Sequence, residues 1–169
     1  RVRLRQKLKK SQIKAMHKLW IMRHGQAQSM ASTDELRPLT DQGRQQVSIN
    51  AQLINNEHFT HVFVSPYLRA QQTWEVLQSQ GVRTQRCITG DWITPDVPTA
   101  PALDELLSLD GDQLNILLVC HQTFAGRLAT HLCDGSTRGR HVETAAIVSI
   151  QAEVFAGQCG MLKGILSSY

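Results

Sequence analysis

The sequence lacks long apolar runs and is poor in aromatic residues, which make up only 5% of its 169 positions. None of its apolar stretches approaches the roughly 20 residues that a membrane-spanning helix needs. Eleven glycines and five prolines are too few for a collagen-like or low-complexity chain. A chain of this length is long enough to bury a sizeable core as one domain. These absences favour a single globular domain that does not enter a membrane.

The sequence also lacks paired cysteines. The four cysteines are widely spaced, without a Cys-x-x-Cys pair or a Cys/His cluster with zinc-binding spacing: Cys87, Cys120, Cys133 and Cys159. A chain of this size needs no disulfide framework. The basic N-terminus is not followed by the apolar segment of a secretory signal before Trp20. We therefore expect a reduced, cytoplasmic protein with no metal and no cofactor.

Basic residues are concentrated at the N-terminus. Residues 1–18 contain eight Lys or Arg and no Asp or Glu, whereas residues 19–169 contain ten basic and 14 acidic residues. The body is therefore mildly acidic, which argues against a nucleic-acid-binding domain. The basic segment could bind an acidic partner, nucleic acid or an anionic membrane surface. Its poor amphipathic pattern instead favours a disordered extension over residues 1–17. We expect residues 18–169 to form one domain and the protein to be a monomer.

Short apolar segments alternate with segments of helical patterning. We predict strands over 19–22, 61–64, 82–89 and 115–120, and helices beginning at 40 and covering 67–80, 102–109 and 124–133. Segments 145–152 and 161–166 can close the sheet as late strands, with antiparallel pairing as one option. Continuous apolar strands between helices indicate a sheet that is covered on both faces. The predicted fold is an α/β three-layer sandwich with a mostly parallel sheet and no large cap insertion.

Two of the predicted helices have recognisable start signals. Thr40 is a suitable N-cap, and Asp41 places a negative charge in the first turn, where the helix dipole favours it. Ser65 followed by Pro66 has the pattern of an N-cap and a first helical residue. We therefore expect Ser65 to cap the helix that carries Arg69.

Polar residues follow three of the predicted strands. His24, Ser65 and His121 each come directly after a strand, and Arg69 lies just beyond Ser65. Ligands of sheets of this kind bind beyond the carboxyl ends of the strands. We therefore expect two imidazoles and the guanidinium groups of Arg23 and Arg69 to meet at one edge of the sheet.

This set of side chains is suited to phosphoryl transfer. A guanidinium group matches two phosphoryl oxygens, and a neutral histidine nitrogen can attack phosphorus to form phosphohistidine. A second histidine can donate to a phosphoryl oxygen without a metal. Gly25 would let the chain turn sharply after His24 and bring backbone N–H groups toward the phosphate. Each residue also has a simpler interpretation: a histidine at a strand end is often structural, and Arg37 could pair with Asp34 or Asp41.

Three motifs resemble those of the histidine phosphatase superfamily, also called the phosphoglycerate mutase-like family. They are LWIMRHG over 19–25, SPYLRAQQT over 65–73 and VCH over 119–121, where Cys120 replaces the commoner serine. The resemblance implies that His24 is the nucleophile, that Arg23 and Arg69 bind the phosphoryl group, and that His121 is the second phosphate-binding histidine. The segment DELRPLT over 34–40 is similar to a loop of the SixA-type phosphohistidine phosphatases, which implies that Arg37 also lines the site.

No acidic residue between the second and third motifs lies in the Leu-x-Glu context that many members of the superfamily use for a general acid. Asp91 is a weak candidate, with a turn residue after Gly90 as the alternative. A leaving imidazole can carry its own proton, so P–N cleavage does not need a strong acid. We therefore expect a phosphohistidine phosphatase whose partner is a phosphorylated protein, such as a phosphotransfer domain of a two-component signalling relay. The alternatives are a phosphatase of small phosphate esters and a non-catalytic module that binds phosphorylated partners.

Overall fold

The computed structural model describes residues 15–169, which contain one mixed sheet of six strands in the order β3-β2-β4-β1-β5-β6. The strands are β1 (His17–Arg23), β2 (His58–Val64), β3 (Arg83–Thr89), β4 (Asn115–Cys120), β5 (Ile147–Ala152) and β6 (Gly160–Leu166). The first four are mutually parallel, whereas β5 runs antiparallel to both β1 and β6. The carboxyl ends of β1, β2 and β4 therefore lie at one edge of the sheet.

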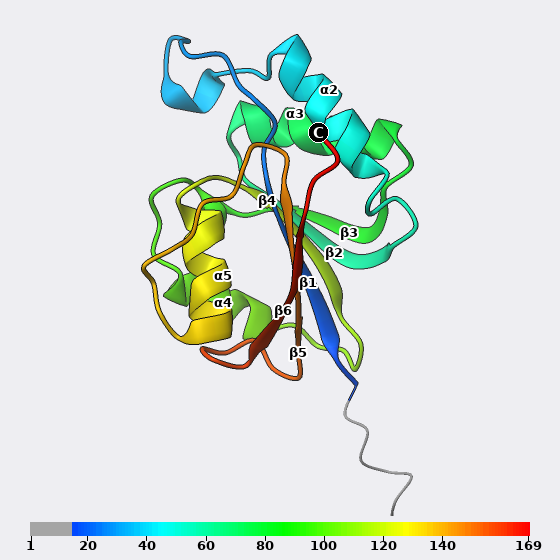
Figure 1. The fold of residues 1–169 in the computed structure, drawn as a ribbon, viewed down its shortest axis with the longest axis vertical. Coiled ribbons are helices and arrows are strands. Elements are labelled where there is room, and N and C mark those ends of the chain that lie inside the picture. The colour runs from blue at the N-terminus through cyan, green and yellow to red at the C-terminus, as the bar shows by residue number, and fades with distance from the viewer. Residues whose placement is uncertain (1–14) are drawn as a thin grey trace, which may run out of the picture.

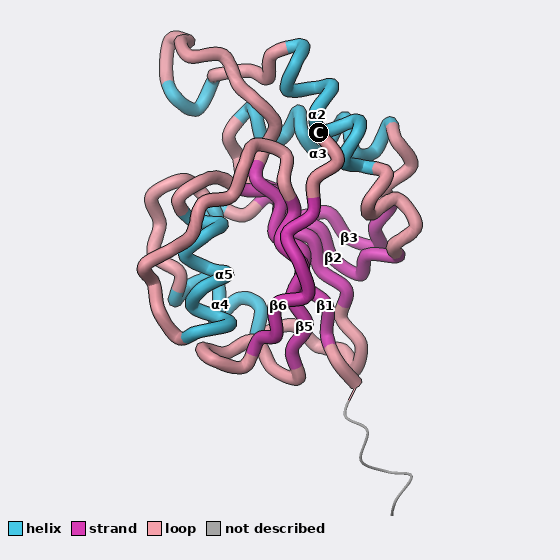
Figure 2. Tube along the Cα trace, in the orientation of Figure 1, coloured by secondary structure: helices cyan, strands magenta, loops and turns pink. Residues whose placement is uncertain are grey.

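Helices lie on both sides of this sheet (Figure 1). They are α2 (Asp41–Ala51), α3 (Leu68–Ser79), α4 (Ala100–Leu107) and α5 (Phe124–Asp134), with short 3-10 helices η1 (Asp34–Leu36) and η2 (Asp91–Ile93). Helices α4 and α5 lie together on one side, and α2 and α3 lie together at the opposite upper corner of the view (Figures 1 and 2). The prediction of an α/β sandwich with a mostly parallel sheet is confirmed.

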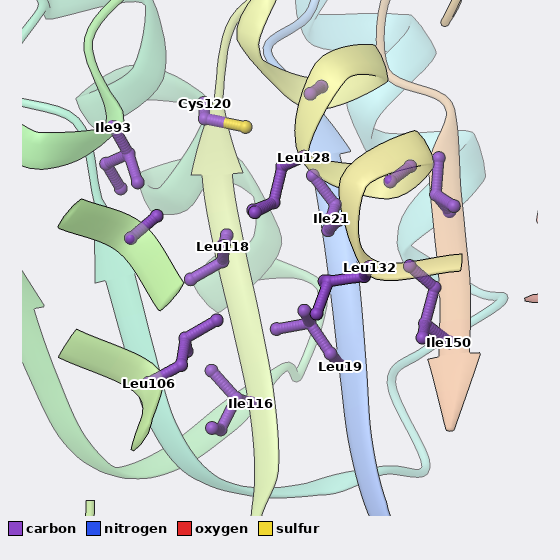
Figure 3. Packing of buried hydrophobic residues seen from close by; sticks show 14 of the residues in the cluster. Leu19, Ile21, Ile93, Leu106, Ile116, Leu118, Cys120, Leu128, Leu132 and Ile150 are labelled. Carbon is purple, nitrogen blue, oxygen red and sulfur yellow. The ribbon is translucent and has the colours of Figure 1, made fainter. Parts of the chain in front are cut away.

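Alternation along the central strands divides the core into two clusters. Leu19 and Leu118 face the cluster that includes α4 and α5, whereas Trp20 and Val119 face the cluster that includes α2 and α3. Figure 3 shows the first cluster, in which Leu128 and other side chains of α5 pack over β1 and β4. Each fully buried aliphatic side chain of this kind contributes about 1.5–3 kcal/mol to folding. Because both faces are covered, the central strands are continuously apolar, which is the pattern that revealed them in the sequence.

The element boundaries follow the prediction closely, although β1 and β2 are each three residues longer than expected. Strand β2 begins at His58, and β5 and β6 form an antiparallel pair that closes the sheet. Helix α4 begins at Ala100 with Pro101 in its first turn, two residues before the predicted start. Helix α5 ends at Gly135, whose backbone is left-handed with a φ of 71°. A glycine suits this position because it adopts that conformation without steric cost.

The two helix start signals have different outcomes. The Gly43 N–H donates to Thr40 Oγ1 at 2.9 Å, so the predicted N-cap of α2 is confirmed. The prediction that Ser65 caps α3 is wrong, because α3 begins at Leu68 and its N-cap position is Tyr67. The Ser65 hydroxyl lies instead against the His121 ring. The same hydroxyl accepts from the Tyr67 N–H at 3.4 Å, so Ser65 has a tertiary partner in addition to a local one.

The expected basic extension falls mostly on residues 1–14, which lie outside the described residues. Its boundary with the domain at residue 17 stays an expectation, and β1 begins at His17. Within residues 15–169, no helix is both long and apolar enough to cross a membrane.

Candidate active site

His24 directly follows β1, and the chain around it fixes the position of its ring. The His24 N–H donates to the Cys120 carbonyl at 2.9 Å, and its own carbonyl accepts from the Ala145 N–H at 3.1 Å. These bonds tie the residue to the end of β4 on one side and to the start of the β5 segment on the other. Only 7% of His24 is exposed. The imidazole is therefore held at the carboxyl edge of the sheet by its backbone.

The hydrogen bonds of the His24 ring determine its tautomer. Nδ1 lies 2.6 Å from the Gly25 carbonyl, which can only accept, so Nδ1 carries the proton. Arg69 Nε–H donates to His24 Nε2 at 3.2 Å, so Nε2 presents a lone pair. Burial, together with the nearby charges of Arg69, Arg23 and Arg37, lowers the pKa of His24 to about 3. The ring is therefore neutral at physiological pH, with Nε2 as an available nucleophile.

His121 follows β4, and its ring lies beside that of His24, with centroids 5.1 Å apart. Its Nε2 is 2.6 Å from Ser65 Oγ, and the ring is completely buried. Its Nδ1 is buried and has no hydrogen-bond partner. Burial lowers the pKa of His121 to about 2, and the charges of His24 and Arg69 contribute to the shift. If the Ser65 hydroxyl donates to Nε2, the unpartnered Nδ1 carries a proton that a phosphoryl oxygen can accept.

Arg23 supplies a second unpartnered donor. Its Nη1 donates to the Val142 carbonyl at 2.9 Å, while its Nε is buried without a hydrogen-bond partner. Buried donors without partners are rare because each loses its bonds to water on folding. The coulombic influence of Arg23 on both His24 and His121 places its charge near the two rings. Arg23 Nε and His121 Nδ1 are therefore suited to bind the oxygens of a tetrahedral anion.

Arg69 and Arg37 are connected by a carboxylate that the sequence reasoning did not select. Asp34 accepts from Arg69 Nη2 at 3.1 Å and from Arg37 Nε at 2.7 Å, and its carbonyl accepts from Arg69 Nη1 at 2.6 Å. Partial burial raises the pKa of Asp34, but the hydrogen bonds and charges of the two arginines outweigh this effect and lower it. The Asp34 carboxylate therefore stays ionised at neutral pH. It accepts a hydrogen bond from the Arg69 guanidinium group, which a phosphoryl group would also need.

Gly25 has a different role from the one expected. Its N–H donates to Thr73 Oγ1 at 3.1 Å and is therefore not free for a phosphoryl oxygen. A Cβ on Gly25 would lie 2.5 Å from the Gly43 carbonyl oxygen and 2.8 Å from Val47 Cγ2. Glycine is needed here for close packing against α2, and the Gly25 carbonyl sets the His24 tautomer. The expected sharp turn with an N–H toward the ligand is not what the geometry shows.

The structure brings together all four residues that were predicted to converge, and adds others. Arg23, His24, Arg69 and His121 meet at the sheet edge as expected, and Arg37 is joined to them through Asp34. The sequence reasoning missed Asp34 as an ion-pair partner of Arg69 and missed Tyr67, whose ring contacts His121 with centroids 5.0 Å apart. The alternative pairing of Arg37 with Asp34, considered in the sequence, already pointed to Asp34. Nothing in the local sequence indicates the contact between Tyr67 and His121.

Asp91, the weak candidate for a general acid, is an exposed residue at the start of η2. Carboxylates other than Asp91 act on the site, through the pKa of Tyr67. Burial raises the pKa of Tyr67, and the charges of Glu35, Asp34 and Asp96 raise it further. Among residues 15–169, no group of three or more His, Cys, Asp or Glu could hold a metal ion.

Comparison with known proteins identifies the family. A model of the histidine phosphatase superfamily (branch 1) matches residues 19–87. The phosphohistidine phosphatase SixA of Escherichia coli K12 is 32% identical over 136 residues, which cover 78% of this chain and 83% of that protein. The chain belongs to the histidine phosphatase superfamily. The superfamily match and the SixA relatives together show a phosphatase, which confirms the predicted enzyme class.

Further comparisons agree in sequence and fold. A SixA homolog of Haemophilus influenzae is 30% identical over 124 residues, which cover 68% of this chain and 76% of that protein. The structure of the protein histidine phosphatase SixA in complex with tungstate superimposes with a TM-score of 0.79 and 27% identity, covering 89% of this chain and 96% of the other. The α-ribazole phosphatase of Shigella flexneri matches with a TM-score of 0.64 at 21% identity, covering 89% of this chain and 96% of the other, which reflects a shared fold.

Proposed function

We propose that this phosphatase removes the phosphoryl group from phosphohistidine on a protein, with a phosphotransfer domain of a two-component relay as the substrate class. The observation that carries the proposal is the set of buried groups without partners beside His24. Arg23 Nε and His121 Nδ1 offer protons, and His24 Nε2 offers a lone pair to the same region. SixA, the relative at 32% identity, is a phosphohistidine phosphatase.

In the first step, a phosphoryl group enters between His24 and His121. His24 Nε2 forms a bond to phosphorus while the bond from phosphorus to the substrate imidazole breaks, and the electron pair of that bond stays on the imidazole. Arg23, Arg69 and His121 stabilise the charge on the three equatorial oxygens. Arg69 Nε–H, which holds the Nε2 lone pair in the free enzyme, then turns to a phosphoryl oxygen.

In the second step, water attacks phosphorus as the bond to His24 Nε2 breaks. The electron pair returns to Nε2, and the proton lost by the water ends on the released phosphate. Neither step requires a protein group to donate a proton to an alkoxide. This matters because Asp34, the carboxylate bonded to Arg69, is held in its ionised form by two arginines. A leaving imidazole that is protonated on its remote nitrogen departs as a neutral molecule.

We also place the enzyme in the cytoplasm. All four cysteines are free. Cys120 is buried, and its carbonyl accepts from the N–H of His24, the candidate nucleophile. Burial raises the pKa of Cys120 to about 12, so this thiol stays protonated and is not a competing nucleophile. Free thiols persist in a reducing compartment, where two-component relays also operate.

The test follows phosphate release from a phosphohistidine phosphotransfer domain. We expect wild-type enzyme to release phosphate and to form an acid-labile phosphoenzyme that maps to His24. His24→Ala should lower turnover by about a thousandfold or more, because the nucleophile is lost. His58→Ala is the matched control. His58 is exposed and is the first residue of β2, at the end of that strand opposite to Ser65. Normal turnover by His24→Ala, or faster turnover of sugar and nucleotide phosphates than of the phosphohistidine protein, would refute the proposal.

A further inference from the structure

A second group of cationic side chains lies beside the candidate active site. A pocket of about 400 Å³ has a lining that includes three arginines and a histidine: Gln122, Thr123, Arg127, Arg138, Gly139, Arg140 and His141. We call it the arginine pocket. The mechanism proposed above uses none of these residues.

The distribution of charge makes this pocket unusual for the molecule. The segment 19–169 is mildly acidic and contains only ten basic residues. Three of them, Arg23, Arg37 and Arg69, belong to the candidate active site, and three more are the arginines of this pocket. No carboxylate lines the pocket, and among the described residues the one ion pair at its rim joins His141 to Glu143 at 3.0 Å. The residues that line the pocket therefore carry a net positive charge, and Glu143 is a carboxylate at its rim.

The pocket is built into the fold. The Arg127 Nη2 donates to the Val97 carbonyl at 3.0 Å, while Arg127 Nε is buried without a partner. The loop with Arg138 and Arg140 packs so tightly on the first turn of α5 that a Cβ at Gly126 would overlap the Arg140 carbonyl. Gln122 Nε2 also donates to that carbonyl at 2.8 Å. The backbone of the loop is therefore held in place, while the side chains of Arg138 and Arg140 stay exposed.

The pocket adjoins the phosphoryl site through two direct connections. Gln122 and Thr123 immediately follow His121, so one wall of the pocket continues from the candidate phosphate-binding histidine. The loop that carries Arg140 and His141 continues to Val142, whose carbonyl accepts from Arg23 Nη1 at 2.9 Å. In Figure 1 this loop runs from α5 to the upper end of the sheet, where β1 and β4 also end. The arginines are therefore placed where a macromolecule that presents a phosphoryl group to His24 could contact them.

We propose that the arginine pocket is a docking site for acidic side chains of the protein that presents the phosphohistidine. The inference rests on the proposed function and adds the chemistry of the partner to it. Arginine pairs with carboxylates through a planar fork of donors, and exposed charges at the rim of an interface mainly raise the rate of association. Because the pocket lies beside the phosphoryl site, the acidic residues of the partner should lie near its phosphohistidine.

The test uses three substrates: the phosphohistidine amino acid and two phosphohistidine peptides of equal length, one flanked by Asp and Glu and one by Asn and Gln. Wild-type enzyme should show a kcat/KM about five- to tenfold higher for the acidic peptide than for the neutral one, with a difference that shrinks at high salt. The double variant Arg138→Gln/Arg140→Gln should lose this preference, and its kcat/KM for the amino acid should stay at the wild-type value. Arg83→Gln/Arg86→Gln, on the exposed edge strand β3, is the matched control and should keep the preference.

The outcomes separate this proposal from the proposed function. If wild-type enzyme releases no phosphate from a phosphohistidine phosphotransfer domain, the proposed function fails, and the docking proposal fails with it. The amino acid and the two peptides test the docking proposal on an enzyme that passes that first assay. If it hydrolyses all three with equal efficiency, or if the double variant keeps the preference for the acidic peptide, the docking proposal alone is overturned. A neutral peptide that gains turnover only when a second phosphate is attached would also overturn it, because the pocket would then bind phosphate.

Discussion

The Nε–H of Arg69 donates to Nε2 of His24 at 3.2 Å, although the two residues are 45 positions apart. Together with the bond between His24 Nδ1 and the Gly25 carbonyl, this contact leaves a neutral ring whose Nε2 lone pair accepts from the Arg69 guanidinium group. The residue that orients the candidate nucleophile in the free enzyme is thus also a candidate to bind the phosphoryl oxygens. The Arg69 Nε–H cannot donate to His24 Nε2 and to a phosphoryl oxygen at the same time, so it must change partner when the phosphoryl group binds.

We predict that Arg69→Lys lowers kcat by about a hundredfold or more, because a lysine is a point charge without the planar fork of donors. The variant should still bind inorganic phosphate, since its charge is kept. Steady-state kinetics on a phosphohistidine substrate measure the effect, and Arg44→Lys on α2 serves as the control. A loss confined to KM, with kcat unchanged, would show that Arg69 acts in binding alone.

Asp34→Asn should tighten the binding of inorganic phosphate by about threefold. The Asp34 carboxylate accepts from both Arg69 and Arg37 in the free enzyme, so an anion must displace it, and a neutral amide competes less well. The inhibition constant for phosphate provides the measurement. Glu35→Gln, at the neighbouring position of η1, should leave it unchanged. Equal or weaker phosphate binding by Asp34→Asn would argue against competition between the carboxylate and the ligand.

Ser65→Ala should lower kcat by about tenfold, because it removes the hydroxyl that lies 2.6 Å from His121 Nε2. Ser65 acts as a positioning residue: its hydroxyl sets which nitrogen of His121 carries the proton. The ¹⁵N chemical shifts of the His121 ring report the tautomer directly and should change in Ser65→Ala. They should stay the same in Ser79→Ala, at the far end of α3. Unchanged ring shifts in Ser65→Ala would limit Ser65 to packing.

The stability of the fold should decrease as the pH falls below about 6.5, the ordinary pKa of histidine. Burial keeps His24 and His121 neutral in the folded protein, with pKa values of about 3 and about 2. The unfolded chain binds protons at these histidines below pH 6.5 and the folded protein does not, so stability rises with pH through this window. Each of the two buried histidines should lower the free energy of unfolding by about 1 kcal/mol when the pH falls from 6.5 to 5.5.

Urea unfolding at the two pH values tests this expectation. His24→Gln and His121→Gln should each remove about 1 kcal/mol of the pH dependence, whereas His58→Gln, at an exposed position, should not change it. If the pH dependence is the same in all four proteins, the two buried histidines do not titrate as their burial implies.

Gly126→Ala should destabilise the protein by about 1–3 kcal/mol, because a Cβ there would overlap the Arg140 carbonyl and overpack the contact between α5 and the loop that follows it. Denaturant unfolding measures the change. Gly164→Ala in β6 is the matched control, since its Cβ would meet Leu166 Cδ2 at an ordinary 3.5 Å. A Gly126→Ala protein with wild-type stability would show that the loop moves away without cost.

The central elements of the fold could be predicted from local patterns. The apolar runs around Leu19 and Ile116 are buried on both faces of the sheet, so their sequence alone reveals them. The same reasoning located His24 and His121, because residues that follow parallel strands meet at one edge. The helix start at Thr40 also follows from a contact between residues only three positions apart.

The sequence by itself thus determined the order of strands and helices, the sheet edge at which the histidines meet and the family motifs, since each depends on neighbours in the chain or on strand direction. Only the tertiary structure decided that Ser65 bonds to His121, 56 positions away, and that Asp34 bridges two arginines. It also decided that Arg127, Arg138 and Arg140 share a pocket. Such contacts depend on how loops pack against helices, and the short-range pattern of apolar and polar residues carries no information about that packing.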